Sequence, residues 1–121
     1  MPEQKHRPGP WILSEYEVRH PITLELTKGC EIFCNRNNKV IAEIPDYCFH
    51  PEDVDQDRAD AHLITVAPEL LADLMDAAAT LRRYEALHRA KGTDDSNAKA
   101  EVNAALASRF EVTIAKAGGQ S

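Results

Sequence analysis

The sequence predicts an α+β fold, with an N-terminal antiparallel meander of three or four strands followed by two long C-terminal helices. Residues 10–48 are rich in β-branched and aromatic side chains with partial alternation, which is typical of strands. Apolar residues in the second half instead recur at spacings of three and four, which indicates buried helical stripes. At 121 residues the chain has the length of one domain with its own core, so we expect a single domain over residues 1–121.

The strands are expected within residues 10–48. The stretches "WILSEYEVRHP" and "ITLELTKG" predict the first two strands, and Ile22, Leu24 and Leu26 would share one face because side chains alternate along a strand. The stretch "CEIFCNRNNKVIAEIPDY" predicts a hairpin with its turn at residues 35–38, because asparagine tolerates the left-handed conformation that such turns need. Three prolines fall at the expected strand ends, where a missing N–H costs least: Pro10, Pro21 and Pro45.

A broken helix is predicted over residues 57–91. The acidic stretch before it, "CFHPEDVDQDRAD", is either a loop or the carboxylate-rich start of this helix. Pro68 lacks a backbone donor and would clash with the preceding turn, so a short helix should end near Val66 and a new one should begin at Ala67 or Pro68. The apolar stripe of this region predicts a core built by four leucines: Leu63, Leu70, Leu71 and Leu74.

The long helix should run to about Lys91, where Gly92 is a plausible stop. The polar connector "TDDSN" offers Ser96 or Asp95 as the next N-cap. The last helix is predicted over residues 96–116. Its apolar residues stand four apart: Val102, Leu106, Phe110 and Ile114.

Charge and hydropathy narrow the classes of partner. The net charge of -6 and the pI near 5.3 argue against duplex nucleic acid as a partner, because affinity there comes mostly from neutralised phosphates. No stretch reaches the roughly 18 apolar residues of a membrane span, and the start of the sequence does not read as a signal peptide. We therefore expect a cytoplasmic protein with no membrane partner, whose three cysteines are reduced.

One group of soft ligands raises the question of a metal. Four such residues follow one another in the first half: Cys30, Cys34, Cys48 and His50. They could in principle hold zinc, but two strand residues four apart lie about 13 Å from each other, too far to share an ion unless the strand bends. The favoured interpretation is that the cysteines are small buried hydrophobic residues.

Catalytic signatures are not found either. Four carboxylates alternate as in a calcium loop but lack its central glycine and its closing glutamate: Asp53, Asp55, Asp57 and Asp60. No nucleophile–base pair, phosphate loop or metalloprotease motif stands out. We expect a protein without catalytic activity and without a cofactor.

The basic residues offer two interpretations. Arg58 and His62 stand four apart on one predicted helical face, and Arg109 stands beside Phe110 on the last helix. Four more lie toward the end of the long helix: Arg82, Arg83, His88 and Arg89. One interpretation is a solvated face with weak ion pairs. The other is that arginines from two helices, or two subunits, converge on a phosphate, for which the rigid guanidinium fork is suited.

Two segments resemble a family of small proteins encoded by phages and prophages. "KHRPGPW", residues 5–11, is similar to their opening Lys-His-Thr-Pro-Gly-Pro-Trp. "ADAHLITVAPELLADL", residues 59–74, is similar to their second hallmark, Ala-Asn-Ala-x-Leu-Ile-Ala-Ala-Ala-Pro-Glu-Leu-Leu-Glu-Ala-Leu. The chain departs from these patterns at Arg7, Asp60, Thr65 and Val66. Asp60 puts in doubt any hydrogen bond that the family's asparagine makes.

The layout of strands before two helices also resembles the phage anti-defence sponges that sequester the cyclic ADP-ribose signal of the Thoeris system. That resemblance implies a non-enzymatic counter-defence protein in the host cytoplasm whose ligand is a small cyclic nucleotide. Five residues are the candidate ligand-binding groups: Arg58, His62, Arg109, Phe110 and Trp11. The arginines would bind phosphate oxygens, and Phe110 or Trp11 would stack on a base.

Two other classes stay open: a protein-binding inhibitor of a host defence factor, for example of the anti-CRISPR type, and a nucleic-acid-binding accessory protein. For any of these we expect a homo-oligomer. A single sheet with two helices leaves an apolar face uncovered. Small residues would let helices of two subunits approach closely: Ala77, Ala78, Ala79 and Ala105.

Overall fold

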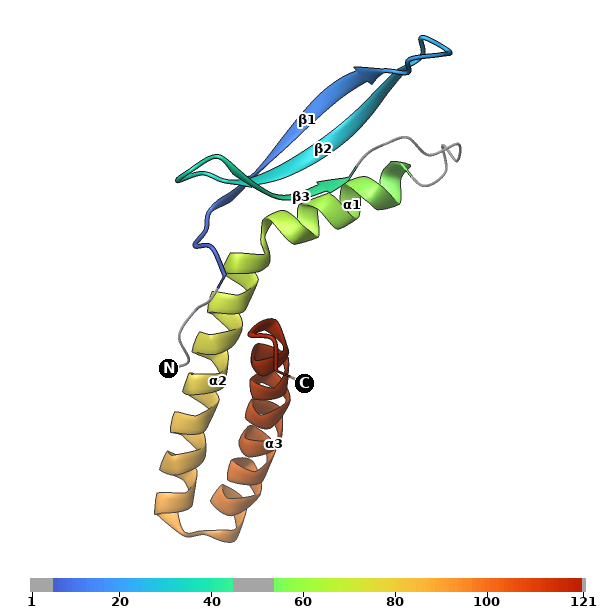
Figure 1. Ribbon diagram of the computed structural model, residues 1–121. Helices are drawn as coiled ribbons and strands as arrows, with labels where there is room; N and C mark the ends of the chain where they lie inside the picture. Colours follow the sequence, from blue (N-terminus) through green and yellow to red (C-terminus); the bar gives the residue numbers. More distant parts are fainter. Residues whose placement is uncertain (1–5, 45–53, 121) are drawn as a thin grey trace. The chain divides into compact units, whose positions relative to one another are not determined.

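The computed structural model describes residues 6–44 and 54–120 and confirms the α+β class. Three antiparallel strands come first: β1 (Trp11–Arg19), β2 (Leu26–Cys34) and β3 (Lys39–Ile44) (Figure 1). Three helices follow: α1 (Val54–Thr65), α2 (Ala67–Lys91) and α3 (Asp94–Ala117). The chain divides into two compact units, residues 7–69 and residues 70–121 with the first six, and each is described by itself. The single domain expected over residues 1–121 stays a prediction.

The sheet of the first unit has the order β1-β2-β3. Trp11 pairs with Cys34 at one end of the β1–β2 ladder and Arg19 pairs with Leu26 at the other. The β2–β3 ladder contains an irregularity between Ile32 and Phe33. Alternation along β2 therefore places Cys30, Ile32 and Cys34 on one face, and all three are buried.

The turn between β2 and β3 lies at residues 35–38, as its asparagines predict. The N–H of Asn38 donates to the Cys34 carbonyl at 2.9 Å, and Asn38 adopts a φ of 54°. The side-chain oxygen of Asn37 accepts the N–H of Lys39 at 3.1 Å. Asparagine thus supplies both the left-handed residue and a side-chain acceptor that closes the turn.

Helix α1 covers one face of the sheet. Ala61 is fully buried against Cys30 and Ile32, and these three residues form the core of this unit. Partly buried apolar side chains surround them: Trp11, Leu13, Ile41, Ala42, Ile44 and Ile64. Among the described residues, the largest side chains that are fully buried are Ile32 and Cys34, so the first unit rests on a small core.

The segment before β1 is attached to this core at several points. The indole N–H of Trp11 donates to the Arg7 carbonyl at 3.2 Å, and the Cys34 thiol contacts the Pro8 carbonyl at 3.6 Å. A Cβ on Gly9 would stand 3.0 Å from the Cβ of Pro68, which is tighter than ordinary contact. The Pro-Gly-Pro-Trp segment and the proline of the helix break therefore lie against each other, and a side chain at position 9 would press on Pro68.

The other sheet face holds a contact that spans all three strands. Tyr16 pairs with Gly29 on β2, and its ring lies so close that any Cβ on Gly29 would overlap it. Its hydroxyl donates to the Glu43 carboxylate on β3 at 2.6 Å. The missing side chain of Gly29 thus lets Tyr16 reach across the central strand.

The second unit is a hairpin of α2 and α3 (Figure 1). Pro68 stands in the first turn of α2, and the break after Thr65 agrees with the sequence expectation. The helix ends at Lys91, and Gly92 follows with a φ of 68°, a conformation that glycine adopts without strain. The expected cap at Ser96 or Asp95 is wrong. Thr93 is the N-cap, because its hydroxyl accepts the N–H of Ser96 at 3.1 Å.

The predicted leucine core is wrong in part. Leu63 is 61% exposed and Leu70 is 50% exposed, whereas Leu71 and Leu74 are half-buried. Val102 of the last helix is 68% exposed, although the other apolar residues of its stripe are half-buried. The fully buried hydrophobic residues of the second unit are alanines: Ala78, Ala100 and Ala107. Two helices enclose only a narrow line of small residues, so the large apolar side chains beside that line stay accessible.

Candidate functional site at the tip of the β1–β2 hairpin

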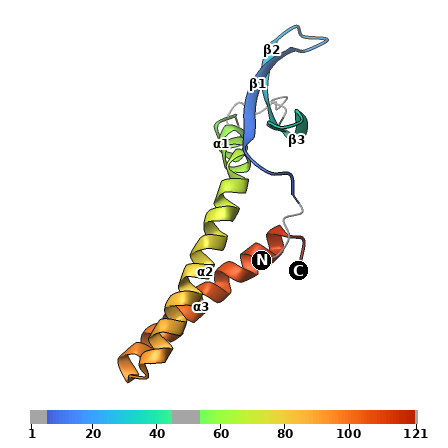
Figure 2. The ribbon, with the colours of Figure 1, turned by 90° about the vertical axis from the view of Figure 1, so that its left-hand side faces the viewer.

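The most distinctive surface of the first unit is the turn between β1 and β2, residues 20–25. The sequence predicts a strand here, but that prediction is wrong, since β2 begins only at Leu26. Pro21 has no N–H to give to a ladder, and the next two N–H groups are bound by a side chain. In Figures 1 and 2 the turn projects past α1, at the far end of the sheet from the segment before β1.

His20 organises this turn. Its Nδ1 accepts the backbone N–H groups of Ile22 and Thr23, both at 3.1 Å. The His20 N–H donates to the Glu25 carbonyl at 2.8 Å, and the His20 carbonyl accepts the Leu24 N–H at 3.0 Å. An imidazole nitrogen that accepts two N–H groups does what an aspartate or asparagine oxygen does in an Asx-turn.

Two further bonds fix the far side of the turn. A guanidinium N–H of Arg19 donates to the Leu24 carbonyl at 3.1 Å. The Glu25 N–H donates to the Thr23 hydroxyl at 3.4 Å. The turn is therefore defined by hydrogen bonds among its own residues.

Leu24 has a backbone conformation that leucine rarely adopts. Its φ is 62°, in the left-handed region, where an L-residue with a Cβ is strained by about 1–2 kcal/mol. Such strain persists only where the surroundings impose it, and it concentrates at functional sites. Here the hydrogen bonds at the Leu24 N–H and carbonyl impose it.

The result is an exposed group of three apolar side chains, which we call the apolar tip: Ile22, Leu24 and Leu26. Ile22 is 85% exposed, and the two leucines are each 60% exposed. Single exposed apolar residues are ordinary, but three of them on one ordered turn are typical of a surface that binds another molecule. The tip has no nucleophile or metal ligand set, so its chemistry is that of an apolar contact.

The candidate ligand-binding residues of the sequence fall in both units. Trp11 lies on β1, packs against the core of the first unit and donates its N–H to Arg7. Arg58 lies on α1, where its Nε is 3.9 Å from the Glu15 carboxylate, and His62 is exposed one turn further on. Arg109 and Phe110 belong to α3 of the second unit. Arg109 is exposed and makes no ion pair with another described residue, and Phe110 is half-buried.

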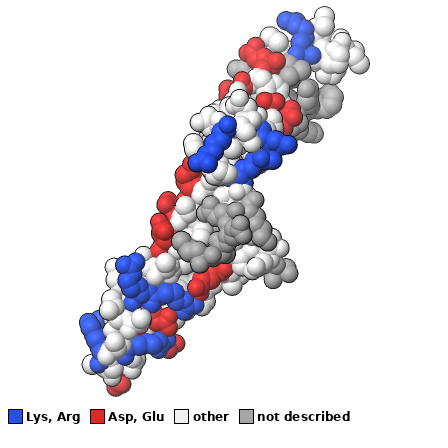
Figure 3. Space-filling model, turned by 60° about the vertical axis from the view of Figure 1, so that its left-hand side comes forward, with Lys and Arg blue, Asp and Glu red and all other residues white. Residues whose placement is uncertain are grey.

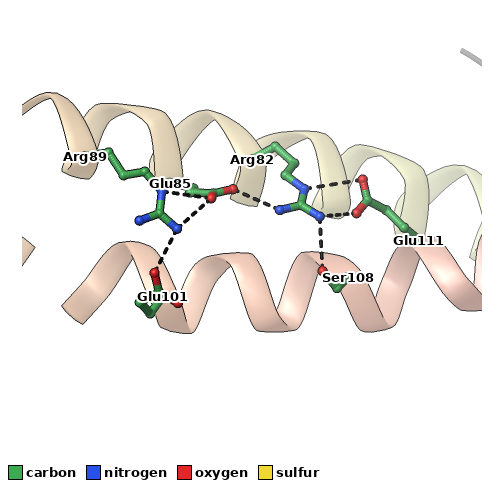
Figure 4. A network of polar contacts seen from close by, with 6 residues as sticks. All are labelled: Arg82, Glu85, Arg89, Glu101, Ser108 and Glu111. Carbon is green, nitrogen blue, oxygen red and sulfur yellow. Dashed lines mark hydrogen bonds and ion pairs between the residues drawn. The ribbon is translucent and has the colours of Figure 1, made fainter. Parts of the chain in front are cut away.

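Two arginines of the long helix have carboxylate partners. Arg82 binds Glu85 on α2 and also Ser108 and Glu111 on α3 (Figure 4). Arg89 binds Glu85 at 3.0 Å and the Glu101 carboxylate of α3 at 3.1 Å. We call these six residues the polar network. It joins the two helices along one side of the hairpin.

The hydrogen bonds and ion pairs of the polar network shift the pKa values of its carboxylates and guanidinium groups. The hydrogen bond from Arg82, followed by that from Arg89, lowers the pKa of Glu85 below its ordinary value of 4.5. The bond from Arg82 likewise lowers the pKa of Glu111. The carboxylates in turn raise the pKa of both guanidinium groups. Arg82 and Arg89 both form ion pairs with carboxylates, so they agree with the first interpretation of the basic residues, a solvated face with ion pairs.

The possible metal ligands do not gather within the described residues. Cys30 and Cys34 are buried on β2, and the buried Ile32 lies between them. Cys48, His50 and Asp53 lie outside the described residues. The other carboxylates of the calcium-like pattern, Asp55, Asp57 and Asp60, stand on α1. Asp57 and Asp60 lie on a different side of this helix from Asp55. Among the described residues, no three potential ligands come together.

A comparison with protein families decides the identity of the chain. The family model described as Salmonella phage P22 protein Y8K6 matches residues 1–121. The chain belongs to this family. It is therefore a small phage protein.

Searches of curated proteins and of solved structures gave no match to this chain. None of the helices within the described residues is long and apolar enough to cross a membrane. The P22 Y8K6 family match extends over both units, so the apolar tip and the helical hairpin both belong to the family region.

Proposed function

We propose that this phage protein is a non-enzymatic accessory factor that binds a host protein through the apolar tip. The observation that carries the proposal is the strained, self-contained turn that holds Ile22 and Leu24 in solvent. A turn that served only to connect two strands would need neither a left-handed leucine nor a bulky apolar side chain at its end. The partner we infer is a host defence protein with an apolar cleft.

The energetics of such a contact are favourable. Full burial of an aliphatic side chain stabilises by about 1.5–3 kcal/mol, so three side chains that are mostly exposed could contribute roughly 3–6 kcal/mol. Because the turn is already ordered, little of this is offset by immobilising the loop on binding. A micromolar complex needs about 8 kcal/mol, so polar contacts around the tip would supply the remainder.

The proposal is tested by site-specific photocrosslinking in infected host cells. A photoreactive amino acid replaces Ile22 at the tip or, as a matched control, Arg36 in the exposed β2–β3 turn. We expect a discrete crosslinked host protein from position 22 and none from position 36. The same crosslink should disappear when Leu24→Asn and Leu26→Ser are added. Identical products from both positions, or no product from position 22, would contradict the proposal.

A second candidate function is sequestration of a cyclic nucleotide immune signal. The observation that favours it is the exposed Arg109 beside the half-buried Phe110, because this guanidinium has no carboxylate partner among the described residues. In this proposal Arg109 binds phosphate oxygens, and Phe110 stacks on a base.

Calorimetry with a panel of cyclic nucleotides separates the two candidates. A sponge should bind one of them with a submicromolar Kd, and Arg109→Ala should weaken binding at least tenfold without moving the melting temperature. Arg36→Ala, an exposed arginine of the first unit, serves as the control. An absence of heat for every nucleotide would remove this second candidate and leave the protein-binding proposal.

A further inference from the structure

The turn at residues 20–25 depends on an ionisable side chain. The Nδ1 atom of His20 accepts the backbone N–H groups of Ile22 and Thr23, both at 3.1 Å. A ring nitrogen accepts hydrogen bonds only while it carries no proton, so these bonds require the neutral imidazole with its proton on Nε2. Histidine is the side chain whose charge ordinarily changes between about pH 5 and pH 8. The conformation of the turn is therefore coupled to the protonation of one residue.

Protonation of Nδ1 does more than remove an acceptor. Both ring nitrogens of an imidazolium are donors, so the added proton would point at two N–H groups that are donors themselves. The ring must then turn away from the N–H groups of Ile22 and Thr23, or the backbone must move. In either case these two N–H groups bind water instead, and the turn loses two of the bonds that define it.

The backbone of Leu24 favours this opening. Its φ of 62° is strained for a residue with a Cβ, and the bonds at its own N–H and carbonyl impose it. Those bonds require that the chain between His20 and Leu24 stays closed. Once the bonds of His20 to the backbone are lost, Leu24 can return to an ordinary negative φ. Release of the strain thus opposes the closed turn and is offset only while His20 accepts both N–H groups.

The charged residues of the turn do not hold an imidazolium in its present place. Within the described residues, the side chain of His20 makes its hydrogen bonds to the backbone and forms no ion pair. Arg19 donates to the Leu24 carbonyl, and Glu25 is the one carboxylate within residues 20–25. In Figure 3 the upper end of the view, where Figure 1 places the turn, is formed by uncharged side chains beside a basic group.

The charged groups of the neighbouring elements lie further along the strands. Glu17 pairs with Lys28 in the β1–β2 ladder, two pairs before the turn. On α1, which packs on β1 and β2, the Arg58 Nε lies 3.9 Å from the Glu15 carboxylate. The turn itself projects past α1 (Figures 1 and 2). Protonation of His20 therefore acts on the turn through the two N–H groups that its ring binds.

We propose that protonation of His20 opens this turn and disperses the apolar tip, so that the tip is presented to a partner only while the imidazole is neutral. The presentation to a partner rests on the function proposed above, whereas the opening of the turn does not. In the closed turn, Ile22 and Leu24 are held in solvent in one arrangement. In the open turn that arrangement is lost, and binding would have to immobilise the loop again, which weakens it.

Nuclear magnetic resonance of the full chain tests the opening directly. Between about pH 8 and pH 5, the ring nitrogens of His20 report its tautomer and protonation, and the amide signals of Ile22 and Thr23 report the two bonds. We expect Nδ1 to be unprotonated at the upper end and both amide signals to shift with the same midpoint as the ring. His62, exposed on α1, is the matched control, because its titration should leave both amides unchanged.

Two variants provide the end states. His20→Asn keeps a side-chain acceptor that does not titrate, and asparagine before proline favours the start of a turn. Both amide signals should therefore keep their closed positions over the whole pH range. His20→Ala removes the acceptor and should show the open positions at every pH. The other signals of the spectrum check that the sheet stays folded in both variants.

Three results would overturn the opening of the turn: amides of Ile22 and Thr23 that do not follow the ring, a closed turn in His20→Ala, or a pH transition that persists in His20→Asn. Photocrosslinking from position 22 in a host lysate, at both ends of the pH range, tests the effect on the partner. The crosslink should be lost at the lower pH in the wild type and kept in His20→Asn. An equal crosslink at both ends contradicts the proposed regulation. A missing crosslink at both ends contradicts the function proposed for the tip, because the amide signals need no partner.

Discussion

The left-handed conformation of Leu24 predicts an unusual order of stability, in which the glycine variant is more stable than the alanine variant. Replacement of Leu24 by glycine removes the strain of about 1–2 kcal/mol but increases the freedom of the unfolded chain, which costs about 0.5–1 kcal/mol. Replacement by alanine keeps the strain. Both changes remove the same partly buried side chain. Leu24→Gly should therefore be more stable than Leu24→Ala by about 0.5–1 kcal/mol.

Leu26 provides a matched control, since it has the same 60% exposure but lies at the start of β2. In a strand, glycine is less stable than alanine by about 0.5–1 kcal/mol. The order of the two variants should therefore reverse between positions 24 and 26. This comparison cancels the lost side chain and isolates the backbone.

Urea denaturation measures these differences. The single tryptophan, Trp11, packs against the core of the first unit, so its fluorescence reports on the unit that contains the tip. Far-UV circular dichroism follows the helices in parallel. If Leu24→Ala is as stable as Leu24→Gly or more stable, the left-handed conformation does not carry the strain assigned to it.

Three further outcomes follow from the packing and the charges. Ile32→Ala removes the largest fully buried side chain and should cost about 2–5 kcal/mol in urea denaturation, whereas a loss below about 1 kcal/mol would mean that the small core is not the main support of the first unit. Gly29→Ala should destabilise the sheet by more than about 1 kcal/mol, because its Cβ displaces the Tyr16 ring, and the same change in a Tyr16→Ala background should cost much less; equal costs would refute the contact. The pKa values of Glu85 and Glu111 are lowered in the folded state, so their ion pairs stabilise the hairpin fully above the ordinary pKa of 4.5. This stabilisation is lost as the pH falls through the lower folded pKa values, so the stability of the helices should decline below pH 4.5. Arg82→Gln should flatten that decline, and an unchanged profile would show that the pairing does not persist in solution.

Local chemistry explains which parts of the fold the sequence predicts well. The turn at residues 35–38 and the break before Pro68 depend on properties that one residue carries wherever it stands: the left-handed tolerance of asparagine and the missing donor of proline. Gly92 ends α2 for the same kind of reason.

The apolar tip shows where that reasoning fails. Ile22, Leu24 and Leu26 alternate as a strand does, but His20 binds two of the N–H groups that a strand would need. Histidine is not among the usual turn residues, so composition gives no warning. The proline after it, at position 21, is the one local signal that could have placed the turn here instead of a strand end.

Contacts between distant residues lie beyond a pattern-based prediction for a different reason. Arg82 binds groups 26 and 29 residues away, and only the helical hairpin brings them together. A periodic stripe likewise predicts which side of a helix is apolar, but not whether anything covers it. Leu70 belongs to the stripe as expected and is half exposed nonetheless.

The outer edge of β1 has a consequence for solubility. No described strand pairs with this nine-residue edge, and such an edge is a template on which chains aggregate. Glu15, Glu17 and Arg19 place a charge at every second position of its last five residues. Two identical edges that approached each other antiparallel with Glu15 opposite Glu15, or Glu15 opposite Glu17, would bring like charges together, which disfavours those pairings. These charges therefore act against edge-to-edge polymerisation of β1, as gatekeeper residues do in other sheets.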